Sequence, residues 1–581
     1  MERTHSNGTL RLSHVGEHVE LVGWVAKKRN FGQLIFIDLR DRTGICQLVF
    51  NESFSEKTKD VRNEYVIHVS GTVQKRQTAN PDLLTGEVEI AVEDFYIINE
   101  AKTTPIIIAD ETDALEDTRL QYRYLDLRRP VMQKKLIMRS KIAHSMREYL
   151  DGQDFIEIET PMLGKSTPEG ARDYLVPSRV HPGSFYALPQ SPQLYKQLLM
   201  ISGFERYYQF ARCFRDEDLR ADRQTDFTQV DIETSFLTEV EIQTMMEEMM
   251  VKVMKEVKGI EIKAPFLRLT YDEAMNRYGS DKPDNRFGFE LQDITSVFAN
   301  TEFKVFKDCL EAKGVIKAIQ IPNYSHITRK DIDKLTNLAK KNGAKGLVWL
   351  KAADGDFTGS ARKFMSDEEV KALYEQLNVQ DKDMLFIVSD AWTRTCNVLG
   401  ALRNEIASQL GLKKKDEFSF LWVTDFPMFE WSEEQQRFTA CHHPFTQPKE
   451  EDIPLLDTDL AAVKANAYDI ILNGYELGGG SLRIYDNKLQ TKIFQILGMS
   501  DQEIQDKFGF FVDAFQYGTP PHGGLAFGFD RIAMILSESD SIRDVIAFPK
   551  NANAKCPMSK APTPVDPAQL EELHISIVEE E

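Results

Sequence analysis

The chain has 581 residues, a length that is too great for one domain and indicates three or four. A hydrophobic content of 42% is ordinary for a globular protein with large cores, and a net charge of −20 argues against nonspecific binding along DNA or another nucleic-acid backbone. No apolar run approaches the roughly 18 residues of a membrane span, and the polar N-terminus lacks a signal-peptide core. The six cysteines form no C-x-x-C pair, so we expect reduced thiols in a cytoplasmic protein without a membrane partner.

Residues 1–103 are predicted to be β-rich. Five short runs alternate apolar and polar residues between turn residues: HVELVGWVAKKR, QLIFIDLRD, GICQLVF, YVIHVSGTVQKR and GEVEIAVEDFYIIN. Five strands in about 100 residues predict a closed barrel of OB type, a common nucleic-acid-binding scaffold. Another small barrel or a sandwich is the alternative that this pattern leaves open.

Residues 104–130 change from acidic to basic and are predicted to form a hinge or linker. A long amphipathic helix closed by Gly152 and a strand ending at Pro161 then open a second domain. Residues 283–415 alternate strand-like and helical runs, which predicts an α/β domain inserted between the two parts, 131–282 and 416–549, of the second domain. With an irregular extension over 550–581, the predicted fold class is α+β multidomain.

Charges of both signs crowd the stretch FARCFRDEDLRADRQTDFTQVDIE (Phe210–Glu233), which otherwise reads as two strands and a turn. Arg215 and Glu217 are two residues apart, so on a strand they point to the same face. Arginine offers a bidentate fork for phosphate or carboxylate, and a buried charge without a partner costs several kcal/mol. A charged ligand that completes the pairing is one interpretation, and a plain ion pair beside a solvated hairpin is the other.

Two glycine-rich segments follow near the C-terminus. HGGLAFGFDRIAMIL leads a strand into a helix with Arg531 in its first turn, where a guanidinium can meet phosphate oxygens. YDIILNGYELGGGSLRIYD carries Asp469 and Glu476, which suit hard oxygen ligation of Mg²⁺. Tight structural packing is the alternative for each segment. The pair His442 and His443 has no third or fourth metal ligand nearby in the sequence, so a loop that contacts substrate is the preferred interpretation.

Together these segments carry a family resemblance. FIEIETP, FRDE and FGFDR occur in the order of motifs 1, 2 and 3 of the class II aminoacyl-tRNA synthetases. STPEGARDYLVPSR, QSPQLYKQLLM, HHPFT and NGYELGGGSLRI are similar to the aspartyl-tRNA synthetases of bacterial type, over essentially the whole chain. The resemblance implies an OB-fold anticodon-binding domain, a catalytic domain with an antiparallel β-sheet flanked by helices, a bacterial insertion, and a homodimer built on motif 1.

The resemblance also implies a reaction. ATP activates L-aspartate to aspartyl-adenylate, and the aspartyl group then passes to the 3′ end of tRNA-Asp. Such chemistry depends on positioning and charge neutralisation rather than on a protein nucleophile. The implied cofactors are ATP, as a substrate, and Mg²⁺.

The residue roles that the resemblance implies fall into sets. The catalytic set is Arg215, Glu217 and Arg531. The ATP-binding set adds Gln224, Phe227, Glu476, Gly528, Phe529 and Asp530, and the metal set is Asp469 and Glu476. The aspartate-binding set is Glu169, Ser191, Gln193, Lys196, Arg215, Asp231, His442, His443 and Arg483. The anticodon set is Lys27, Arg29, Phe31, Phe36 and Gln47.

Specificity is expected to rest on a few of these residues. Lys196 and Arg483 should reject asparagine, because its amide would leave both cations unpaired. Phe36 is expected to stack on a base, with a place in the barrel core as the alternative. Position 31 often carries leucine in strict enzymes and histidine in relaxed ones that also charge tRNA-Asn, so the apolar Phe31 favours a strict enzyme. The alternative from another class is an inactive synthetase-like RNA-binding protein.

Overall fold

A computed structural model describes residues 3–32, 34–167, 171–219 and 221–578. The chain divides into two compact units, Met1–Arg139 with Arg543–Pro564 and Ser140–Ile542 with Val565–Glu581, and each is described by itself. All six cysteines lie within the described ranges and are free thiols, as the sequence predicts. Within these ranges no helix is long and apolar enough to cross a membrane.

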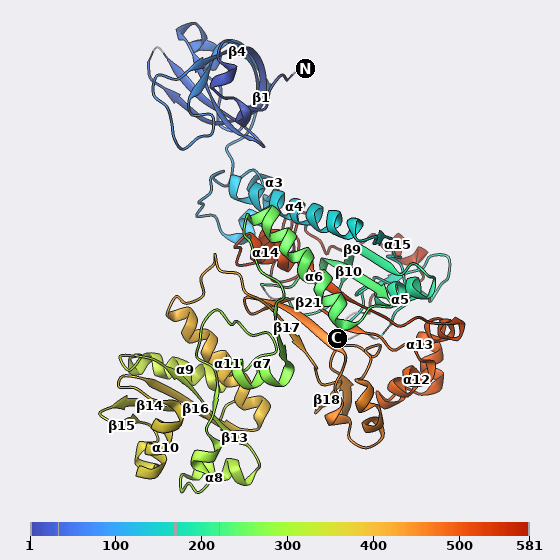
Figure 1. Ribbon diagram of the computed structural model, residues 1–581. Helices are drawn as coiled ribbons and strands as arrows, with labels where there is room; N and C mark the ends of the chain where they lie inside the picture. Colours follow the sequence, from blue (N-terminus) through green and yellow to red (C-terminus); the bar gives the residue numbers. More distant parts are fainter. Residues whose placement is uncertain (1–2, 33, 168–170, 220, 579–581) are drawn as a thin grey trace. The chain divides into compact units, whose positions relative to one another are not determined.

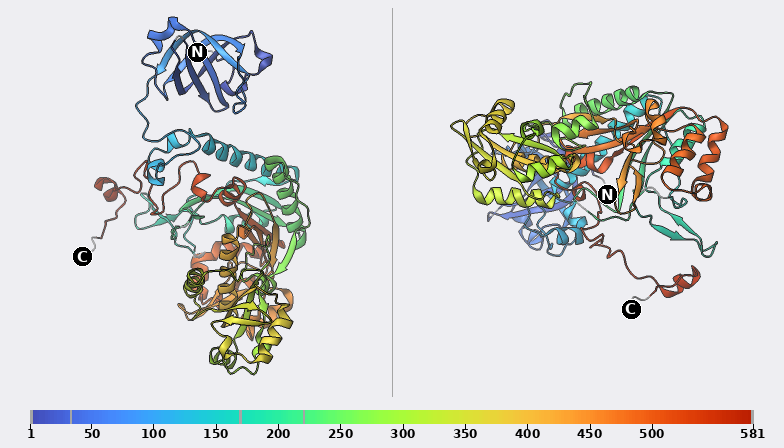
Figure 2. Two further views of the ribbon diagram at one scale, coloured as in Figure 1. Left: turned by 90° about the vertical axis from the view of Figure 1, so that its left-hand side faces the viewer. Right: turned by 90° about the horizontal axis from the view of Figure 1, so that it is seen from below.

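The first unit contains a closed five-stranded barrel in which all five predicted strands are present (Figures 1 and 2). The strands are β1 (His18–Asn30), β2 (Ile35–Asp41), β3 (Gly44–Phe50), β4 (Val66–Lys75) and β5 (Val88–Asn99), with the short helix α1 (Ser55–Thr58) between β3 and β4. Their order is β1-β2-β3-β5-β4; β1 pairs with β4 and β3 pairs in parallel with β5, which closes the barrel. The prediction of an OB-type barrel is confirmed.

Alternation along the strands sorts side chains between the barrel core and its outer surface. On β2, Ile35, Ile37 and Leu39 are buried in the core. Successive residues of a strand point to opposite faces, so Phe36 faces outward. The alternative in which Phe36 fills the barrel core is therefore wrong.

Three helices follow the barrel: α2 (Glu116–Gln121), α3 (Arg123–Asp126) and α4 (Pro130–Gly152). The buried Arg123 pairs with Asp126 at 2.6 Å and donates hydrogen bonds to the carbonyl oxygens of Arg543, Ile546 and Ala547 at 2.6–2.9 Å. These bonds join the segment Arg543–Pro564 to the rest of the first unit.

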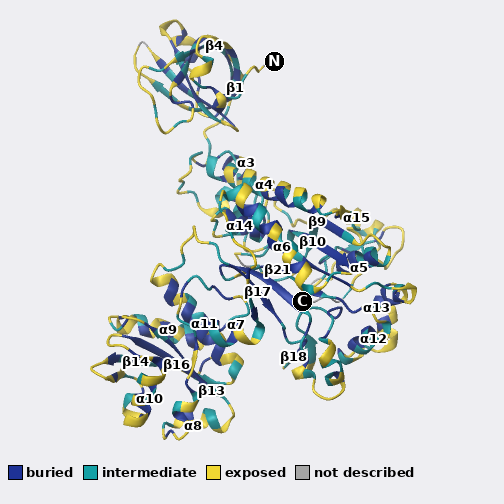
Figure 3. Cartoon of the chain, viewed as in Figure 1, coloured by how far each residue is buried: buried dark blue, intermediate teal, exposed yellow. Residues whose placement is uncertain are grey.

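The second unit is built on an eight-stranded sheet with the order β11-β17-β20-β21-β22-β10-β9-β6. Its strands are β6 (Ile156–Glu157), β9 (Arg206–Phe214), β10 (Asp226–Ser235), β11 (Leu267–Thr270), β17 (Phe420–Thr424), β20 (Ala467–Leu472), β21 (Tyr475–Leu482) and β22 (His522–Gly528). The six central strands are antiparallel, and each edge strand joins its neighbour in parallel. Most residues of the central strands are buried (Figure 3).

The remaining elements of this unit surround the sheet. They are the strand pairs β7 (Leu175–Pro177) with β8 (Phe185–Ala187) and β18 (Phe429–Ser432) with β19 (Arg437–Ala440), and the helices α5 (Gln193–Ile201), α6 (Glu239–Val253), α12 (Asn487–Ile496), α13 (Asp501–Ala514), α14 (Phe529–Leu536) and α15 (Pro567–Glu572). The methionine-rich helix α6 buries Met246, Met249 and Met250. The predicted antiparallel sheet flanked by helices is confirmed.

Between β11 and β17 lies a separate five-stranded antiparallel sheet with the order β12-β13-β16-β14-β15 (Figure 1). Its strands are β12 (Gln292–Asp293), β13 (Val315–Ile321), β14 (Val348–Ala353), β15 (Asp356–Gly359) and β16 (Met384–Asp390), and its helices are α8 (Lys304–Glu311), α9 (Arg329–Lys341), α10 (Asp367–Leu377) and α11 (Trp392–Gln409). This region is the insertion that the sequence predicts.

Helix α7 (Tyr271–Tyr278) joins the large sheet to the insertion and packs into both cores. Met275 belongs to the apolar cluster of the insertion, whereas Ala274 and Tyr278 belong to the cluster of the large sheet. Gly279 ends the helix with φ of +67°. A Cβ atom on Gly400 of α11 would lie 2.2 Å from the carbonyl oxygen of Gly279, so only a glycine at 400 lets the two backbones approach this closely.

Candidate active site

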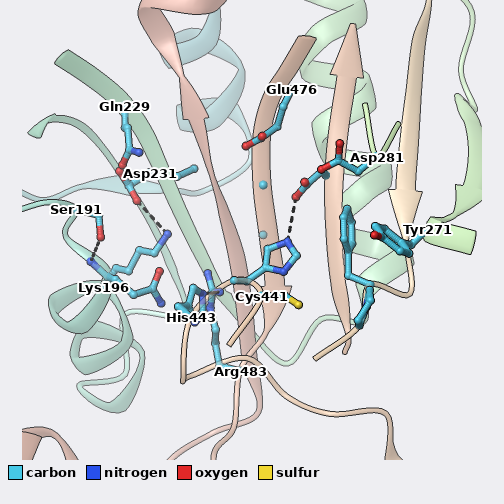
Figure 4. Close-up of a pocket in the computed structure, with 18 of the residues that line it drawn as sticks. Ser191, Lys196, Gln229, Asp231, Tyr271, Asp281, Cys441, His443, Glu476 and Arg483 are labelled. Atoms are coloured by element: carbon cyan, nitrogen blue, oxygen red, sulfur yellow. Dashed lines mark hydrogen bonds and ion pairs between the residues drawn. The ribbon is translucent and has the colours of Figure 1, made fainter. Parts of the chain in front are cut away.

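The register of four neighbouring strands builds the floor of a cavity of about 560 Å³. Asp231 of β10 pairs with Ala526 of β22, Ala526 with Gly479 of β21, and Gly479 with Asp469 of β20. Directly paired residues share a face of the sheet, so two carboxylates point the same way across two small residues. A Cβ atom on Gly479 would lie 2.5 Å from Asp469 Oδ1, so a side chain at this position would displace that carboxylate. Ala526 and Gly479 thus leave the floor open between Asp231, which Figure 4 labels, and Asp469.

One wall of this cavity holds two fully buried cations. Lys196 Nζ, from α5, lies 3.0 Å from Asp231 Oδ1 and 3.3 Å from Glu233 Oε2. Arg483, just after β21, donates from Nε and Nη2 to the two oxygens of Glu233 at 2.8 and 3.1 Å. The two cations and two carboxylates form a neutral group of four, named here the charge quartet.

The charge quartet corrects one expectation from the sequence. Lys196 and Arg483 are not left unpaired in the absence of a ligand, because Glu233 pairs with both of them. A fully buried cation without a partner would cost several kcal/mol, so the fold itself must supply an anion. Of the five N–H groups of Arg483, four have partners within the described ranges (Glu233 twice, His443 and Ser481), and one on Nη2 is available to a ligand.

His443 is part of the same wall. Its Nε2 lies 2.7 Å from Arg483 Nη1, and its Nδ1 lies 3.2 Å from the backbone N–H of Phe445 and 3.3 Å from Thr446 Oγ1. Burial, and then the positive charge of Arg483, hold the pKa of His443 well below its usual value. The ring is therefore neutral and orients the guanidinium without adding charge.

Beside the charge quartet, two buried polar atoms have no hydrogen-bond partner in the part of the chain that the structure describes. They are Asp231 Oδ2 and Gln193 Nε2. Burial raises the pKa of Asp231, and Lys196 opposes that rise. Ser191 lines the cavity beside these residues, so an acceptor and a donor are both aimed at a ligand here.

The opposite wall is acidic. Asp469 Oδ1 is buried without a hydrogen-bond partner among the described residues, and His442 Nε2 lies 3.6 Å from it. Burial lowers the pKa of His442, but Asp469, Glu476 and Asp281 together raise it above its usual value. Burial and then repulsion by Asp469 raise the pKa of Glu476. Two neighbouring carboxylates, one of them with an orphaned buried oxygen, suit a divalent cation, so the predicted metal pair fits Mg²⁺.

A second cavity, of about 230 Å³, adjoins the first and shares Arg215, Gln229, Glu476 and Ala526 with it. It brings together most of the predicted ATP-binding set: Arg215, Glu217, Gln224, Phe227, Glu476, Gly528, Asp530 and Arg531. The Arg215 guanidinium lies 5.1 Å from the centre of the Phe227 ring. Arg531 donates to the carbonyl oxygen of Glu476 at 2.5 Å and pairs with Asp222 at 3.2 Å.

Some predicted residues are placed differently from what the sequence suggests. Strand β9 ends at Phe214, so Arg215 and Glu217 lie in the turn after it and not on a strand. The Phe529 ring packs against Phe210 in the core, 5.2 Å between centres, and does not line the second cavity. Asp530 Oδ2 accepts from the backbone N–H of Thr228 at 2.9 Å. Glu169 lies outside the described residues.

Sequence reasoning also missed residues that line these cavities: Gln229, Tyr271, Asp281, Asp222 and Arg223, with Glu233 behind the two cations. Glu233 stands two residues after Asp231, so the period of a strand places both on one face. That spacing was the only sequence signal for it. Asp281 had none, because it belongs to a loop at the start of the insertion.

The anticodon set gathers on the outer surface of the barrel. Arg29 of β1 pairs with Phe36 of β2 in register, and Phe31 packs edge-to-face on Phe36 with 5.7 Å between ring centres. Arg29 donates to Gln47 Oε1 at 3.2 Å, and Lys27 is exposed nearby on β1. Gln47 is also held by Arg76 at 2.6 Å and Glu89 at 2.8 Å, two residues that the sequence did not single out. An exposed Phe31 packed on a half-buried, outward-facing Phe36 beside cations suits single-stranded nucleic acid.

Comparison with protein families gives two matches. The model of tRNA synthetases class II (D, K and N) matches residues 115–552, and that of the OB-fold nucleic acid binding domain matches residues 19–98.

Full-length relatives are also found. The chain is 55% identical to the aspartate–tRNA ligase of Geobacillus kaustophilus, covering 100% of this chain and 99% of the relative. It is 55% identical to an aspartate–tRNA(Asp/Asn) ligase of Bacillus cereus, covering 99% of each chain.

Solved structures share the fold at much lower identity. The asparaginyl-tRNA synthetase of Pyrococcus horikoshii, complexed with asparaginyl-adenylate, is 19% identical with a TM-score of 0.57, over 92% of this chain and 95% of that one. The aspartyl tRNA synthetase of Entamoeba histolytica is 19% identical with a TM-score of 0.56, over 93% and 89%. At this identity the likeness bears on the fold alone.

Proposed function

Because the chain belongs to the bacterial aspartate–tRNA ligases, within the class II tRNA synthetases, we propose that its two adjoining cavities divide the substrates of that reaction between them. The enzyme activates aspartate with ATP and then transfers the aspartyl group to tRNA. The larger cavity would hold aspartate and the smaller one the nucleotide. Arg215, which lines both cavities, would stand where the two substrates meet.

The observation that carries this proposal is the charge quartet with its unsatisfied atoms. The β-carboxylate of aspartate would bind Lys196 and the available Nη2–H of Arg483. The α-ammonium would bind Asp231 Oδ2, which is buried and has no partner in the described part of the chain. Asparagine would present an amide to the same donors. The loss of one or two charge-assisted hydrogen bonds should reduce its use on the order of 10²- to 10⁴-fold.

The second cavity supports a nucleotide. Phe227 offers a ring for adenine, and the guanidinium of Arg531 stands across the cavity for phosphate oxygens. An oxygen of the α-carboxylate of aspartate forms a bond to the α-phosphorus of ATP. The bond from that phosphorus to the oxygen that bridges to the β-phosphorus breaks, so that pyrophosphate leaves with the electron pair. Arg215 would neutralise charge on the reacting carboxylate and the α-phosphate.

Asp469 and Glu476 would hold Mg²⁺ in this proposal. The ion supplies charge neutralisation for the phosphates when it is bound. Asp469 and Glu476 form an acidic wall of the cavity, and His442 Nε2 faces Asp469 across it. His442 would also keep a proton near that wall, since the acidic neighbours raise its pKa.

The outer surface of the barrel would read the anticodon of tRNA-Asp. Phe36 and Phe31 would stack on bases, while Arg29 and Gln47 would hydrogen-bond base edges and Lys27 would lie near the backbone. Some relatives are named aspartate–tRNA ligase, and others are named aspartate–tRNA(Asp/Asn) ligase. Phe31, 69% exposed and apolar, favours the strict enzyme.

We further propose a cytoplasmic homodimer. Strand β6 forms the edge of the large sheet, and apolar residues near it are exposed: Ile156, Met162 and Leu163. Burying this edge and these side chains against a second copy would remove both from water. Sedimentation at micromolar concentration tests this, and a monomer would contradict it.

The experiment for the function is charging of tRNA-Asp and tRNA-Asn transcripts with aspartate by the purified chain. We expect rapid charging of tRNA-Asp and charging of tRNA-Asn that is slower by at least 100-fold. Comparable rates on both would mean the relaxed enzyme. No charging of tRNA-Asp, with no aspartate-dependent exchange of pyrophosphate into ATP, would defeat the proposal.

A further inference from the structure

The loop that opens the insertion, Gly279–Asp284, reaches the acidic wall of the aspartate cavity. Asp281 lines that cavity beside Glu476 (Figure 4). Lys282 Nζ lies 3.8 Å from Glu476 Oε2 and 3.9 Å from Asp281 Oδ2. A lysine from the start of the insertion therefore stands on the outer side of a carboxylate that both cavities share.

Both ends of this loop are fixed by close packing. At its start, Gly279 touches the backbone of α11, because a Cβ there would lie 2.2 Å from the carbonyl oxygen of Cys396. At its end, the buried Asp284 pairs with Arg286 at 2.7 Å. A Cβ on Gly474 would lie 3.1 Å from Asp284 Cβ, so the loop ends against the turn between β20 and β21. Those two strands carry Asp469 and Glu476, and Lys282 is held next to them.

The charges around Lys282 change when the substrates bind. Without ligands, Lys282 stands beside Asp281 and Glu476, and it opposes the rise in pKa that burial and Asp469 impose on Glu476. A divalent cation on Asp469 and Glu476 would neutralise those carboxylates. The Lys282 side chain is 47% exposed, so its ammonium could then turn to another anion. The nearest one in the reaction is the polyphosphate between Arg215 and Arg531.

We propose that Lys282 binds the β- and γ-phosphates of ATP and the pyrophosphate that leaves. This inference rests on the proposed function of the two cavities. Arg215 approaches the nucleotide from the turn after β9 and Arg531 from α14, whereas Lys282 approaches from the insertion. A flexible point charge on the solvent side suits a group that must bind pyrophosphate and then release it. The insertion thereby contributes a substrate-binding residue to the active site.

The test is aspartate-dependent exchange of pyrophosphate into ATP by the full chain. In Lys282→Ala we expect the KM values for pyrophosphate and ATP to rise about tenfold, as for the loss of one charge-assisted hydrogen bond. The KM for aspartate should stay within about twofold, and Lys282→Arg should recover most of the loss. Lys415→Ala is the matched control, because Lys415 is an exposed lysine paired with Asp540 at 3.3 Å and lines neither cavity.

Two results would overturn the inference. The first is unchanged KM values for pyrophosphate and ATP in Lys282→Ala. The second is tighter Mg²⁺ binding in that variant with an unchanged KM for pyrophosphate, which would mean that Lys282 only neutralises Glu476. Both require a wild-type enzyme that performs the exchange. A wild type that performs none would instead defeat the proposed function, so the two failures are distinguishable.

Discussion

Glu233 uses both of its carboxylate oxygens on Arg483, at 2.8 Å to Nε and 3.1 Å to Nη2. The two residues are 250 positions apart in the chain and fully buried. The same carboxylate lies 3.3 Å from Lys196 Nζ, so one anion fixes the positions of two cations before any substrate arrives. Burial raises the pKa of Glu233, but Arg483 and Lys196 outweigh it and hold this pKa below its usual value.

Glu233→Gln should therefore destabilise the protein strongly. It removes the charge and leaves two buried cations with Asp231 alone, and breaking a buried pair in this way costs about 3–5 kcal/mol. Thermal or urea unfolding measures the change. Glu290→Gln is the matched control, because Glu290 makes the same two-point contact with Arg277 at a half-exposed site, where a pair contributes less than about 1 kcal/mol. Equal losses in the two variants would contradict this reasoning.

Lys196→Met should lower kcat/KM for aspartate on the order of 10³-fold or more, because the β-carboxylate loses a buried cationic donor. Pyrophosphate exchange measures it. Lys317→Met is a control of the same type: Lys317 is 3% exposed and donates to Asn276 at 2.8 Å, but it lies in the insertion. Its loss should affect stability and leave aspartate activation intact. Near-normal pyrophosphate exchange in Lys196→Met would contradict the assignment of Lys196 to the β-carboxylate of aspartate.

Sequence predicted the elements whose signals are local. The five barrel strands follow from alternation within each run, and the motif residues of the nucleotide cavity follow from short stretches around Arg215 and Arg531. Glu233 was missed because its partners come from α5 and from the far end of the chain, and only the order of the sheet brings them together. Asp281 and Lys282 were missed because a loop at the edge of an insertion shows no periodicity. The side chain of Phe529 packs in the core against Phe210. The motif sequence around it does not show that the ring points away from the nucleotide cavity.

Phe36→Leu should impair tRNA charging without affecting aspartate activation. A lost base stack of about 1–3 kcal/mol corresponds to roughly 5- to 150-fold in the KM for tRNA. Pyrophosphate exchange in the absence of tRNA should be unchanged. Tyr96→Leu is the control, because Tyr96 is an exposed aromatic elsewhere on the barrel, stacked on His68 with 4.8 Å between ring centres. A similar effect of both substitutions on charging would refute a specific role for Phe36.

Gly400→Ala should disturb the active site from within the insertion. Its methyl group would lie 2.2 Å from the carbonyl oxygen of Gly279, so the loop that carries Asp281 and Lys282 must shift. We expect the KM for pyrophosphate to rise several-fold. In Gly346→Ala the new methyl group meets open space, and kinetics should match those of the wild type. Identical kinetics for both variants would show that the contact between α11 and the loop is dispensable.

His443 makes stability depend on pH. Burial and Arg483 lower its folded pKa far below the unfolded value of about 6.5. Above pH 6.5 both states are neutral and the group contributes nothing; below it the unfolded chain binds a proton that the folded one refuses. Stability should therefore fall on acidification, by up to roughly 1.4 kcal/mol per pH unit.

Melting temperatures at pH 7.5 and 5.5 measure the effect of His443. The difference between them should be smaller in His443→Gln than in the wild type. Part of the slope should remain, because burial lowers the pKa of His522 in the same direction. An unchanged slope would contradict the assignment of a neutral, buried ring.

Helix α7 has a consequence for how this enzyme could be shortened. Met275 packs into the core of the insertion while Ala274 and Tyr278 pack into that of the large sheet, within a single helix of eight residues. Deleting residues 283–415 would uncover Met275 and remove the α11 backbone on which Gly279 rests. The insertion is therefore not a detachable module: a minimal enzyme would need a redesigned face on α7, and exchange of insertions between relatives would have to carry the helix with them.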